Sequence, residues 1–418
     1  MDPTIAGRTL MGDSLGFHII IALLSIGIPF LMNIFGFLAW KKKDARSAQF
    51  VRLLVRWTAV LAVAGAISGT VVSIQFSTLW APFLAYSQPY VGQFFALEGY
   101  AFLIEVIFLA WYLVREKKAS PRTLWLLGLP VTLGAIGSAF FITIINAWMN
   151  NPAAVWTSTT TLEISHSVTA YLFATTLLVI GYVAWRVWRK KTESKDGQRL
   201  ILQLGIIGFV LLIIVAVLGD LSAVNDAATQ PTKLAAIEIL DKTQTNAPLR
   251  IGGEINADGV AQGGVVLPGF LSLLAGHDFN YKVQGLDNTP KNQWPLLVVH
   301  SIFDIKIFLV GYTSVLLLVL LAFRWRLKRQ PRWFLLVLAI SGVLGIVLVE
   351  LGWMITELGR QPWAVAGKLL VSDAFTKNVD VVKIGYIFPC LFVVLLAATI
   401  FALKMVTKKW HKVEDVKW

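Results

Sequence analysis

Eight ionisable residues fall within, or at the edges of, long apolar stretches of this chain. They are His18, Glu98, Glu105, His166, Asp304, Lys306, Glu350 and Glu357. A charged side chain at the centre of a bilayer costs roughly 2.5–3.5 kcal/mol on insertion scales. Any one of the eight could be a helix-end group or half of an internal ion pair. Together they are too costly to be incidental, and they indicate intramembrane chemistry.

The spacing of the four glutamates limits the kinds of intramembrane chemistry that they can support. Glu98 and Glu105 are seven residues apart, so in a helix they share one face, within roughly 20° and about 10 Å apart along the axis. Glu350 and Glu357 repeat the spacing, with Trp353 between them on the same face. Carboxylate pairs in helix interiors are suited to a proton path or to metal ligation.

His18 and His166 each stand alone in an apolar helix. An imidazole there suits haem iron, which takes an axial histidine. The alternative, a hydrogen-bonded core histidine, is equally compatible with the pattern. No Cys-x-x-Cys-His motif is present, so any haem would be held without thioether links.

The composition is that of a membrane protein. Of the 418 residues, 56% are hydrophobic and 15% charged, against about a quarter charged in soluble proteins. The net charge of +13 lies in short blocks between apolar stretches, which argues against nucleic acid as a partner. The single cysteine, Cys390, excludes an intrachain disulfide framework. The N-terminus has no basic region of a signal peptide, and no nucleotide-binding loop or zinc spacing is found.

Nine apolar stretches are long enough to cross the hydrocarbon core as helices, so we expect an all-α integral membrane protein with about nine transmembrane helices. They cover residues 14–40, 54–78, 93–114, 123–148, 164–187, 200–220, 294–322, 333–357 and 384–405. Five basic segments carry 26 of the 37 Lys and Arg residues: 41–56, 115–122, 186–199, 324–332 and the tail from Lys404. The opposite connections, such as 149–163, are nearly free of them. By the positive-inside rule the N-terminus lies outside and the C-terminus in the cytoplasm.

One outer connection, residues 226–293, is long, polar and rich in glycine. A connection of this length is usually functional. We therefore expect three parts: helices 1–6 in residues 1–225, an outer binding loop in residues 226–293, and helices 7–9 with a cytoplasmic tail in residues 294–418.

Several strings now resemble one family, subunit I of the cytochrome bd-type quinol oxidases, of the short quinol-loop type. Residues 359–363 (GRQPW, ending in Trp363) are similar to a signature of that subunit, and residues 232–238 (TKLAAIE) to its quinol-loop motif. Residues 146–152 (NAWMNNP) and 97–99 (LEG) resemble two further landmarks. Their order agrees over about 400 residues, essentially the whole chain.

The resemblance implies roles for individual residues at the oxygen side. His18, ten residues after Arg8, matches the ligand of a high-spin haem (haem d in the best-known members), and Glu98 matches a carboxylate beside or on that iron. Glu357 matches the ligand of the high-spin haem b, and Arg360 would balance propionate charge. Trp353 matches an aromatic residue between haems. Glu105 and Ser138 match positions in a proton path from the cytoplasm, although the interval from Glu98 to Glu105 is one residue shorter than in the best-studied members.

On the quinol side the resemblance implies that His166 is one axial ligand of the low-spin haem b, and that Lys233 and Glu238 take part in quinol oxidation. The chain departs from the family at the second axial ligand. Lys306 stands where a methionine is expected, in the string Phe303-Asp304-Ile305-Lys306. A neutral amine can ligate iron, but Lys306 could instead pair with Asp304 or extend outward. His300, about 9 Å away along the helix, is a further candidate ligand.

The resemblance thus implies a quinol:dioxygen oxidoreductase. It oxidises quinol outside, reduces dioxygen to water with cytoplasmic protons, and builds a proton motive force without pumping. Its cofactors would be low-spin and high-spin haem b, with haem d or another haem b at the oxygen site. Its partners would be subunit II and a small single-span subunit in the plasma membrane of a prokaryote. The alternatives are a membrane cytochrome with two or three haems that transfers electrons or senses redox state without reducing dioxygen, and a non-haem carrier.

Overall fold

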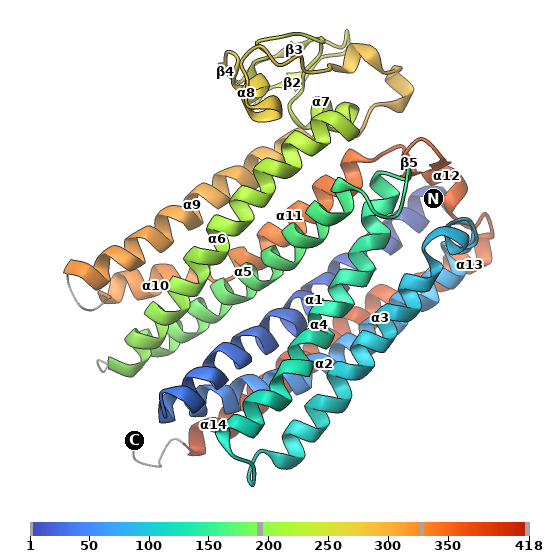
Figure 1. Ribbon diagram of the computed structural model, residues 1–418. Coiled ribbons are helices and arrows are strands. Elements are labelled where there is room, and N and C mark those ends of the chain that lie inside the picture. Colours follow the sequence, from blue (N-terminus) through green and yellow to red (C-terminus); the bar gives the residue numbers. More distant parts are fainter. Residues whose placement is uncertain (1–2, 190–194, 327–329, 414–418) are drawn as a thin grey trace. The chain divides into compact units, whose positions relative to one another are not determined.

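The computed structural model describes residues 3–189, 195–326 and 330–413 (Figure 1). Parts of the basic segments 186–199 and 324–332, and the end of the basic tail, lie outside these residues. The chain forms two compact units. The first comprises Met1–Ile142 and Ser372–Trp418, and the second comprises Thr143–Val371.

Nine helical spans within the described residues are long and apolar enough to cross a membrane, which confirms the predicted number. The helices that form them are α1 (Pro3–Lys41), α2 (Ala45–Thr78), α3 (Ala81–Arg115), α4 (Pro121–Asn150), α5 (Ser158–Arg189), α6 (Lys195–Thr229), α9 (Val298–Arg326), α10 (Arg332–Ser341) with α11 (Leu344–Gly359), and α13 (Val379–Gly385) with α14 (Ile387–Val413). Several run past the predicted ends, because a helix that is apolar within the membrane continues into its polar flanks. Glu163, predicted to lie in a connection, is therefore inside α5.

The eighth predicted span, residues 333–357, is two helices rather than one. A turn at Gly342 and Val343 separates α10 from α11. At this turn the backbone lies against α5, since a Cβ atom on Gly342 would be 2.8 Å from the Cα atom of Gly181. The close approach requires glycine on both sides, which a single-helix prediction did not consider.

In the first unit, α1 packs along α2, and α2 also contacts α3 and α14. Helices α3 and α4 approach closely at Gly134. A Cβ atom there would lie 2.7 Å from both the carbonyl oxygen of Ala101 and the backbone nitrogen of Glu105. Gly134 thus allows α4 to reach the face of α3 that carries the carboxylates.

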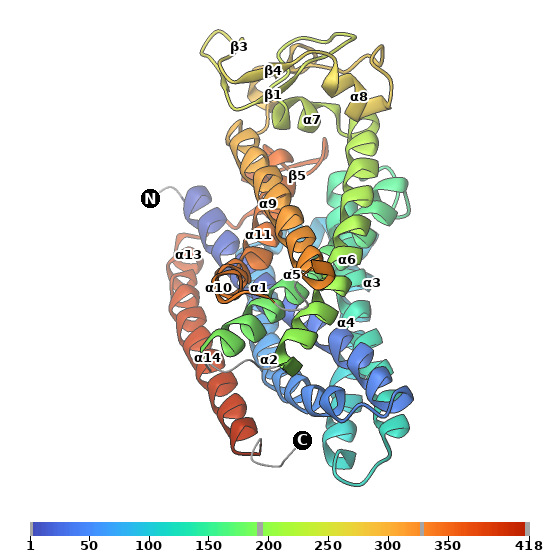
Figure 2. The ribbon, with the colours of Figure 1, turned by 90° about the vertical axis from the view of Figure 1, so that its left-hand side faces the viewer.

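In the second unit, α5 packs against α6, α10 and α11, while α9 contacts α6 and α11 (Figure 2). The chain after α11 forms a small antiparallel pair, β5 (Trp363–Val365) with β6 (Leu369–Leu370), and then α12 (Val371–Ala374). The backbone N–H of Ala366 donates to the carbonyl oxygen of Met149 at 2.9 Å. This hydrogen bond ties the turn after α11 to the end of α4.

The long polar connection is ordered rather than structureless. It contains α7 (Pro231–Ile237), α8 (Phe270–Gly276), the 3-10 helices η1 (Leu286–Asn288) and η2 (Lys291–Gln293), and two antiparallel strand pairs, β1 (Leu249–Ile251) with β4 (Val265–Leu267) and β2 (Glu254–Ile255) with β3 (Ala261–Gln262). It begins a few residues later than predicted, because α6 continues to Thr229. Buried side chains of α7 pack with Leu271, Val283 and Ile355, so the segment is anchored on α11.

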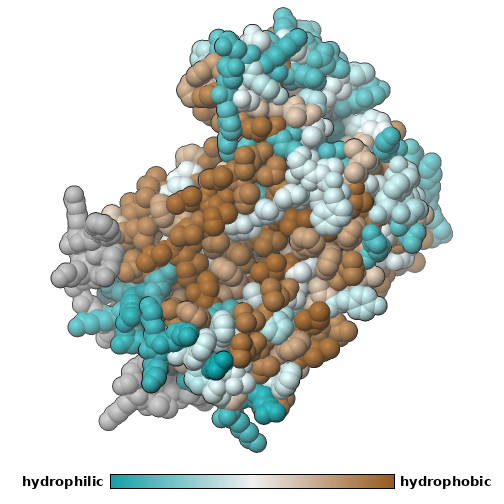
Figure 3. Space-filling model, in the orientation of Figure 1, coloured by the Kyte–Doolittle hydropathy of each residue, from teal (hydrophilic) through white to brown (hydrophobic). Residues whose placement is uncertain are grey.

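The surface of the second unit agrees with a membrane location. Hydrophobic residues cover the visible face of α6 and α9, whereas the segment with the strands β1–β4 is largely hydrophilic (Figure 3). Val217 on α6 and Phe308 on α9 are 55% and 73% exposed. Exposed apolar side chains of this kind face lipid or another subunit in a membrane protein.

Candidate functional site

His18 is held on α1 by a hydrogen bond across to α2. Its Nδ1 lies 2.8 Å from Ser68 Oγ, and Ser68 Oγ donates to the carbonyl oxygen of Gly65 at 3.2 Å. When the hydroxyl donates to Gly65 it can accept from the Nδ1–H of His18, and that tautomer leaves the Nε2 lone pair available. Histidine ligands of metals are commonly oriented in this way. Gly69 stands beside the ring, where a Cβ atom would be 3.4 Å from Cε1 of His18.

The two carboxylates of α3 both face α4. Ser138 Oγ donates to Glu98 Oε1 at 2.9 Å. Glu105 is 2% exposed, lies beside Gly134, and its buried Oε1 has no hydrogen-bond partner among the residues that the structure describes. Arg8 is half-buried on α1. The first unit thus holds five of the predicted site residues: Arg8, His18, Glu98, Glu105 and Ser138.

His166 and Lys306 belong to the second unit, on α5 and α9. Nδ1 of His166 is buried and has no hydrogen-bond partner in the described part of the chain, and Lys306 is within electrostatic range of the ring. Both side chains face glycines. A Cβ atom on Gly219 would be 3.5 Å from Cε1 of His166, and one on Gly352 would be 3.3 Å from Nζ of Lys306. Asp304 accepts instead from the backbone N–H of Gly252 at 2.6 Å and lies 3.4 Å from Nε2 of His300. Lys306 has no ion pair within the described residues, so the alternative pairing with Asp304 is not formed.

These surroundings fit the haem groups that the resemblance implies. At His18 the hydroxyl of Ser68 orients Nδ1, and Nε2 can donate its lone pair to a metal. Next to the imidazole of His166 and the amine of Lys306 stand Gly219 and Gly352, which have no side chains to fill the space beside these groups. Nitrogen donors with adjacent space are what haem iron and its macrocycle require.

Glu357 and Arg360, at the end of α11, are joined to the end of α4. Glu357 Oε1 accepts from Asn146 Nδ2 at 2.7 Å, and its Oε2 accepts from Arg360 Nη2. Arg360 Nη1 donates to Asn150 Oδ1 at 2.7 Å. Trp353 and Trp363 are both half-buried, the first one turn before Glu357 and the second on β5.

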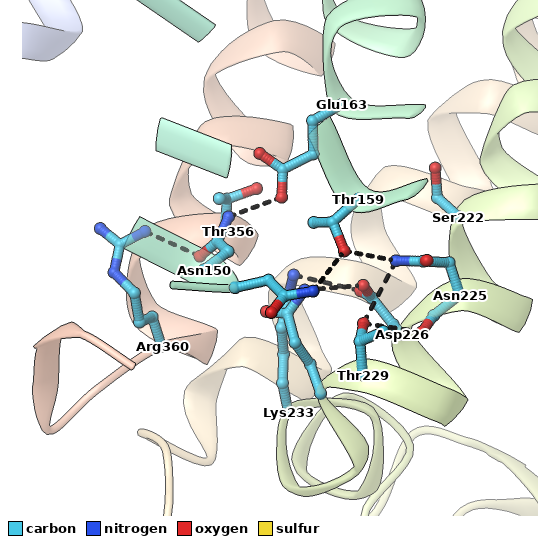
Figure 4. Close-up of polar contacts among 12 residues, drawn as sticks. Asn150, Thr159, Glu163, Ser222, Asn225, Asp226, Thr229, Lys233, Thr356 and Arg360 are labelled. Atoms are coloured by element: carbon cyan, nitrogen blue, oxygen red, sulfur yellow. Dashed lines mark hydrogen bonds and ion pairs between the residues drawn. The ribbon is translucent and has the colours of Figure 1, made fainter. Parts of the chain in front are cut away.

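Asn150 extends this network to a carboxylate that the sequence did not single out. Asn150 Nδ2 donates to Glu163 Oε1 at 2.7 Å (Figure 4). Glu163 is within electrostatic range of Lys233, Asp226 and Arg360. The signal that could have identified Glu163 is its position three residues before His166, which places both on nearly the same face of one helix.

Lys233 lies on α7 and is 8% exposed. Its Nζ forms an ion pair with Asp226 Oδ2 at 3.1 Å (Figure 4). Its side-chain stem lies against the backbone of the turn after α11, because a Cβ atom on Gly359 would be 3.0 Å from Cγ of Lys233. The two strings that carry the resemblance, 232–238 and 359–363, are therefore in contact.

Glu238 follows α7 and is 5% exposed. Burial, together with the nearby carboxylate of Asp304, raises the pKa of Glu238 from 4.5 to about 8. His300 supports this end of α7, since its Nδ1 donates to the carbonyl oxygen of Ile237 at 2.7 Å. This hydrogen bond joins α9 to the outer segment.

The chain is similar to known proteins over nearly its whole length. The family model for cytochrome bd terminal oxidase subunit I matches residues 6–412. A putative cytochrome bd menaquinol oxidase subunit I of Bacillus subtilis (strain 168) is 29% identical, over 99% of this chain and 98% of that protein. Subunit 1 of the cytochrome bd-II ubiquinol oxidase of Escherichia coli (strain K12) is 23% identical, over 84% of this chain and 85% of that protein.

Among solved structures, that of the bd oxidase from Geobacillus thermodenitrificans is similar, with a TM-score of 0.90 and 26% identity. The likeness covers 98% of this chain and 99% of that one. Nine apolar spans in the described residues and bacterial relatives indicate a multi-pass protein of a prokaryotic plasma membrane. Since the family model covers nearly the whole chain, the protein belongs to the cytochrome bd terminal oxidase subunit I family.

Proposed function

We propose that this chain is the catalytic subunit of a quinol:dioxygen oxidoreductase that oxidises quinol at the outer segment and reduces dioxygen to water. The observation that carries the proposal is the contact between Lys233 and the turn at Gly359, which brings the quinol-loop string against the Glu357–Arg360 pair. A quinol at Lys233 would thus be bound next to residues suited to hold a redox group.

On the quinol side, the ammonium group of Lys233 is held by Asp226 and can donate a hydrogen bond to a quinol oxygen. Glu238 is the base we assign to the first quinol proton. It is buried beside Asp304, and a carboxylate whose pKa is about 8 is matched to proton transfer near neutral pH. The released protons leave on the outer side.

Five residues are proposed to hold the haems: His18, Glu98 and Glu357 for the high-spin groups, and His166 with Lys306 for the low-spin haem b. The oxygen-site group is haem d or a further haem b. When bound, the haems supply electron transfer and oxygen-reducing chemistry. Around them the chain contributes Ser68, which orients His18, and Arg360, which neutralises negative charge.

Lys306 is proposed to ligate through its amine. The support is its position within electrostatic range of His166, its contact with Gly352, and the engagement of Asp304 with other groups. Trp353, one residue after Gly352, is the proposed aromatic residue between the redox groups.

Protons for water formation are proposed to arrive from the cytoplasmic side through Glu105 and the Glu98–Ser138 pair. Glu98 and Glu105 lie two turns apart on α3, and Ser138 of α4 donates a hydrogen bond to Glu98. With the N-terminus outside and the C-terminus in the cytoplasm, quinol protons leave outside and water protons enter from inside. This sidedness separates charge without a pump. Subunit II, and a small single-span subunit, are the proposed partners.

The test is a reduced-minus-oxidised optical spectrum of the purified complex, with pyridine haemochrome quantitation and oxygen uptake on added quinol. We expect three haems per complex, one of them reactive with CO, and quinol-dependent oxygen consumption. Haems without oxygen consumption would contradict the proposal and favour a cytochrome that only transfers electrons or senses redox state. Absence of haem would favour a carrier.

A further inference from the structure

A cluster of charged side chains lies where the ends of α4, α5 and α6 meet α7 and the end of α11 (Figure 4). We call it the Glu163 cluster. It consists of Asn150, Glu163, Asp226, Lys233, Glu357 and Arg360. All six residues belong to the second compact unit.

The three carboxylates of the cluster differ in the hydrogen-bond and ion-pair partners of their oxygens. Asp226 uses both oxygens: Oδ2 pairs with Lys233 at 3.1 Å, and Oδ1 accepts from Gln230 Nε2 at 2.9 Å. Glu357 also uses both, with Asn146 and Arg360. Glu163 accepts a hydrogen bond only at Oε1, from the neutral amide of Asn150, so among the described residues its Oε2 is left without a donor.

The charges of the cluster do not balance. Lys233 and Arg360 supply two positive charges, whereas Asp226, Glu163 and Glu357 supply three negative charges when all are ionised. Two further titratable groups are His166, about one turn along α5 from Glu163, and Lys306 on α9, which is within electrostatic range of Lys233. Lys306 would restore neutrality only as an ammonium, and not as an amine bound to iron.

The cations Lys233 and Arg360 are buried and the three carboxylates are half-buried, so the excess negative charge is only partly screened by solvent and raises the proton affinity of the cluster. The proton goes to the carboxylate that has no cation as a direct partner. Glu163 meets this description, and it is within electrostatic range of Lys233 and Arg360 rather than in contact with either.

We propose that Glu163 is a second proton-accepting residue on the quinol side, which takes up one proton when a quinol beside Lys233 is oxidised. The inference rests on the proposed function. Quinol has two hydroxyl groups, and each loses one proton: one O–H bond forms on Glu238 and the other on Glu163. The two electrons pass to the oxidase reaction, in which dioxygen is the final oxidant.

Asn150 connects Glu163 to Arg360 through two hydrogen bonds. Its side chain donates to Glu163 and accepts from Arg360, so protonation of Glu163 weakens one hydrogen bond of an amide whose other end holds the guanidinium. Arg360 in turn pairs with Glu357. The protonation state on the quinol side is therefore communicated to the residues that we assign to haem binding.

The test uses the purified complex with Glu163→Gln, Glu163→Asp and, as a matched control, Glu116→Gln. Glu116 pairs with Arg56 at 3.3 Å in the other compact unit. We expect Glu163→Gln to lower kcat for quinol at least about tenfold with little change in KM, because general bases contribute about 10²–10⁴-fold. Its pH–rate profile should lose one ionisation. Glu163→Asp should restore most of the rate, and Glu116→Gln should behave as wild type.

A second measurement does not depend on turnover. In redox-induced infrared difference spectra of the wild-type complex, reduction and reoxidation at an electrode should change a carboxylic acid C=O band. The band should be absent in Glu163→Gln and present in Glu116→Gln. Haem content and spectra equal to those of the wild type would show that Glu163→Gln is folded.

The outcomes separate the two proposals. A wild-type complex that oxidises no quinol would overturn the proposed function, and this inference with it. An active wild type, with Glu163→Gln retaining full kcat, an unaltered pH profile and the same infrared band, would overturn the role of Glu163 alone.

Discussion

Arg360 Nη1 donates a hydrogen bond to Asn150 Oδ1 at 2.7 Å, across 210 positions of sequence. The two residues are 5% and 2% exposed, so their hydrogen bond is almost wholly shielded from solvent. The same asparagine donates to Glu163. A single amide thus links the string that identifies the family to a carboxylate on the quinol side.

Replacing Asn150 by alanine should destabilise the complex. Arg360 Nη1 and Glu163 Oε1 each lose a partner, and an unsatisfied buried polar group costs about 1–3 kcal/mol. We expect a lower midpoint of thermal denaturation, together with slower quinol oxidation. Asn280→Ala, at an exposed position in the outer segment, is the control. Equal midpoints for both variants would contradict a structural role for Asn150.

Replacing Lys306 by methionine should change the low-spin haem. A thioether ligand raises the haem potential relative to a harder nitrogen ligand. We expect a shifted low-spin band and a higher midpoint potential in redox titrations followed optically. Lys282→Met, at an exposed position in the outer segment, should leave both unchanged. An unaltered spectrum and midpoint in Lys306→Met would mean that the amine does not bind iron.

Glu238 should make the stability of the complex depend on pH. Burial, with the carboxylate of Asp304, raises its pKa from 4.5 to about 8. Because the folded-state pKa is the higher one, the stabilisation from Glu238 is fully present below pH 4.5 and is lost as the pH rises through 8. Between about pH 5 and 9 the wild type should lose on the order of a few kcal/mol more stability than Glu238→Gln.

Thermal denaturation of both proteins across that range measures the difference. Curves that stay parallel from acid to alkaline pH would exclude the raised pKa. In the active wild type, the rate of quinol oxidation should rise with pH through about 8, since the base must be ionised to accept a proton. Glu238→Gln should lack that rise.

Replacing Ser68 by alanine should weaken haem binding at His18. The hydroxyl is the hydrogen-bond partner of Nδ1, and loss of such a partner typically costs about 10–100-fold in metal affinity or activity. We expect less haem per complex and a changed high-spin spectrum. Ser73→Ala serves as the control, because it removes an exposed hydroxyl of the same helix that donates to the carbonyl oxygen of Gly69. Full haem occupancy with an unchanged spectrum in Ser68→Ala would contradict the orienting role.

The number of membrane spans, their approximate positions and the family could be predicted from the sequence. Hydropathy is a property of local composition, and the strings at 232–238 and 359–363 are specific without knowledge of their neighbours. The positions of the helix ends are predicted less accurately, because the helices continue beyond their apolar stretches into polar flanks. For this reason Glu163 was assigned to a connection although it lies in α5.

The sequence by itself thus determined that this is a nine-span membrane protein of the bd oxidase subunit I family with ionisable residues in its helices. Only the tertiary structure decided which of those residues meet. The turn at Gly342 lies against the backbone of Gly181, and the partner of His18 is Ser68, fifty residues away. Likewise Lys233 pairs with Asp226, and Glu163 is joined to Arg360 through Asn150. Such contacts depend on how helices distant in sequence pack, and no local pattern of residues encodes that packing.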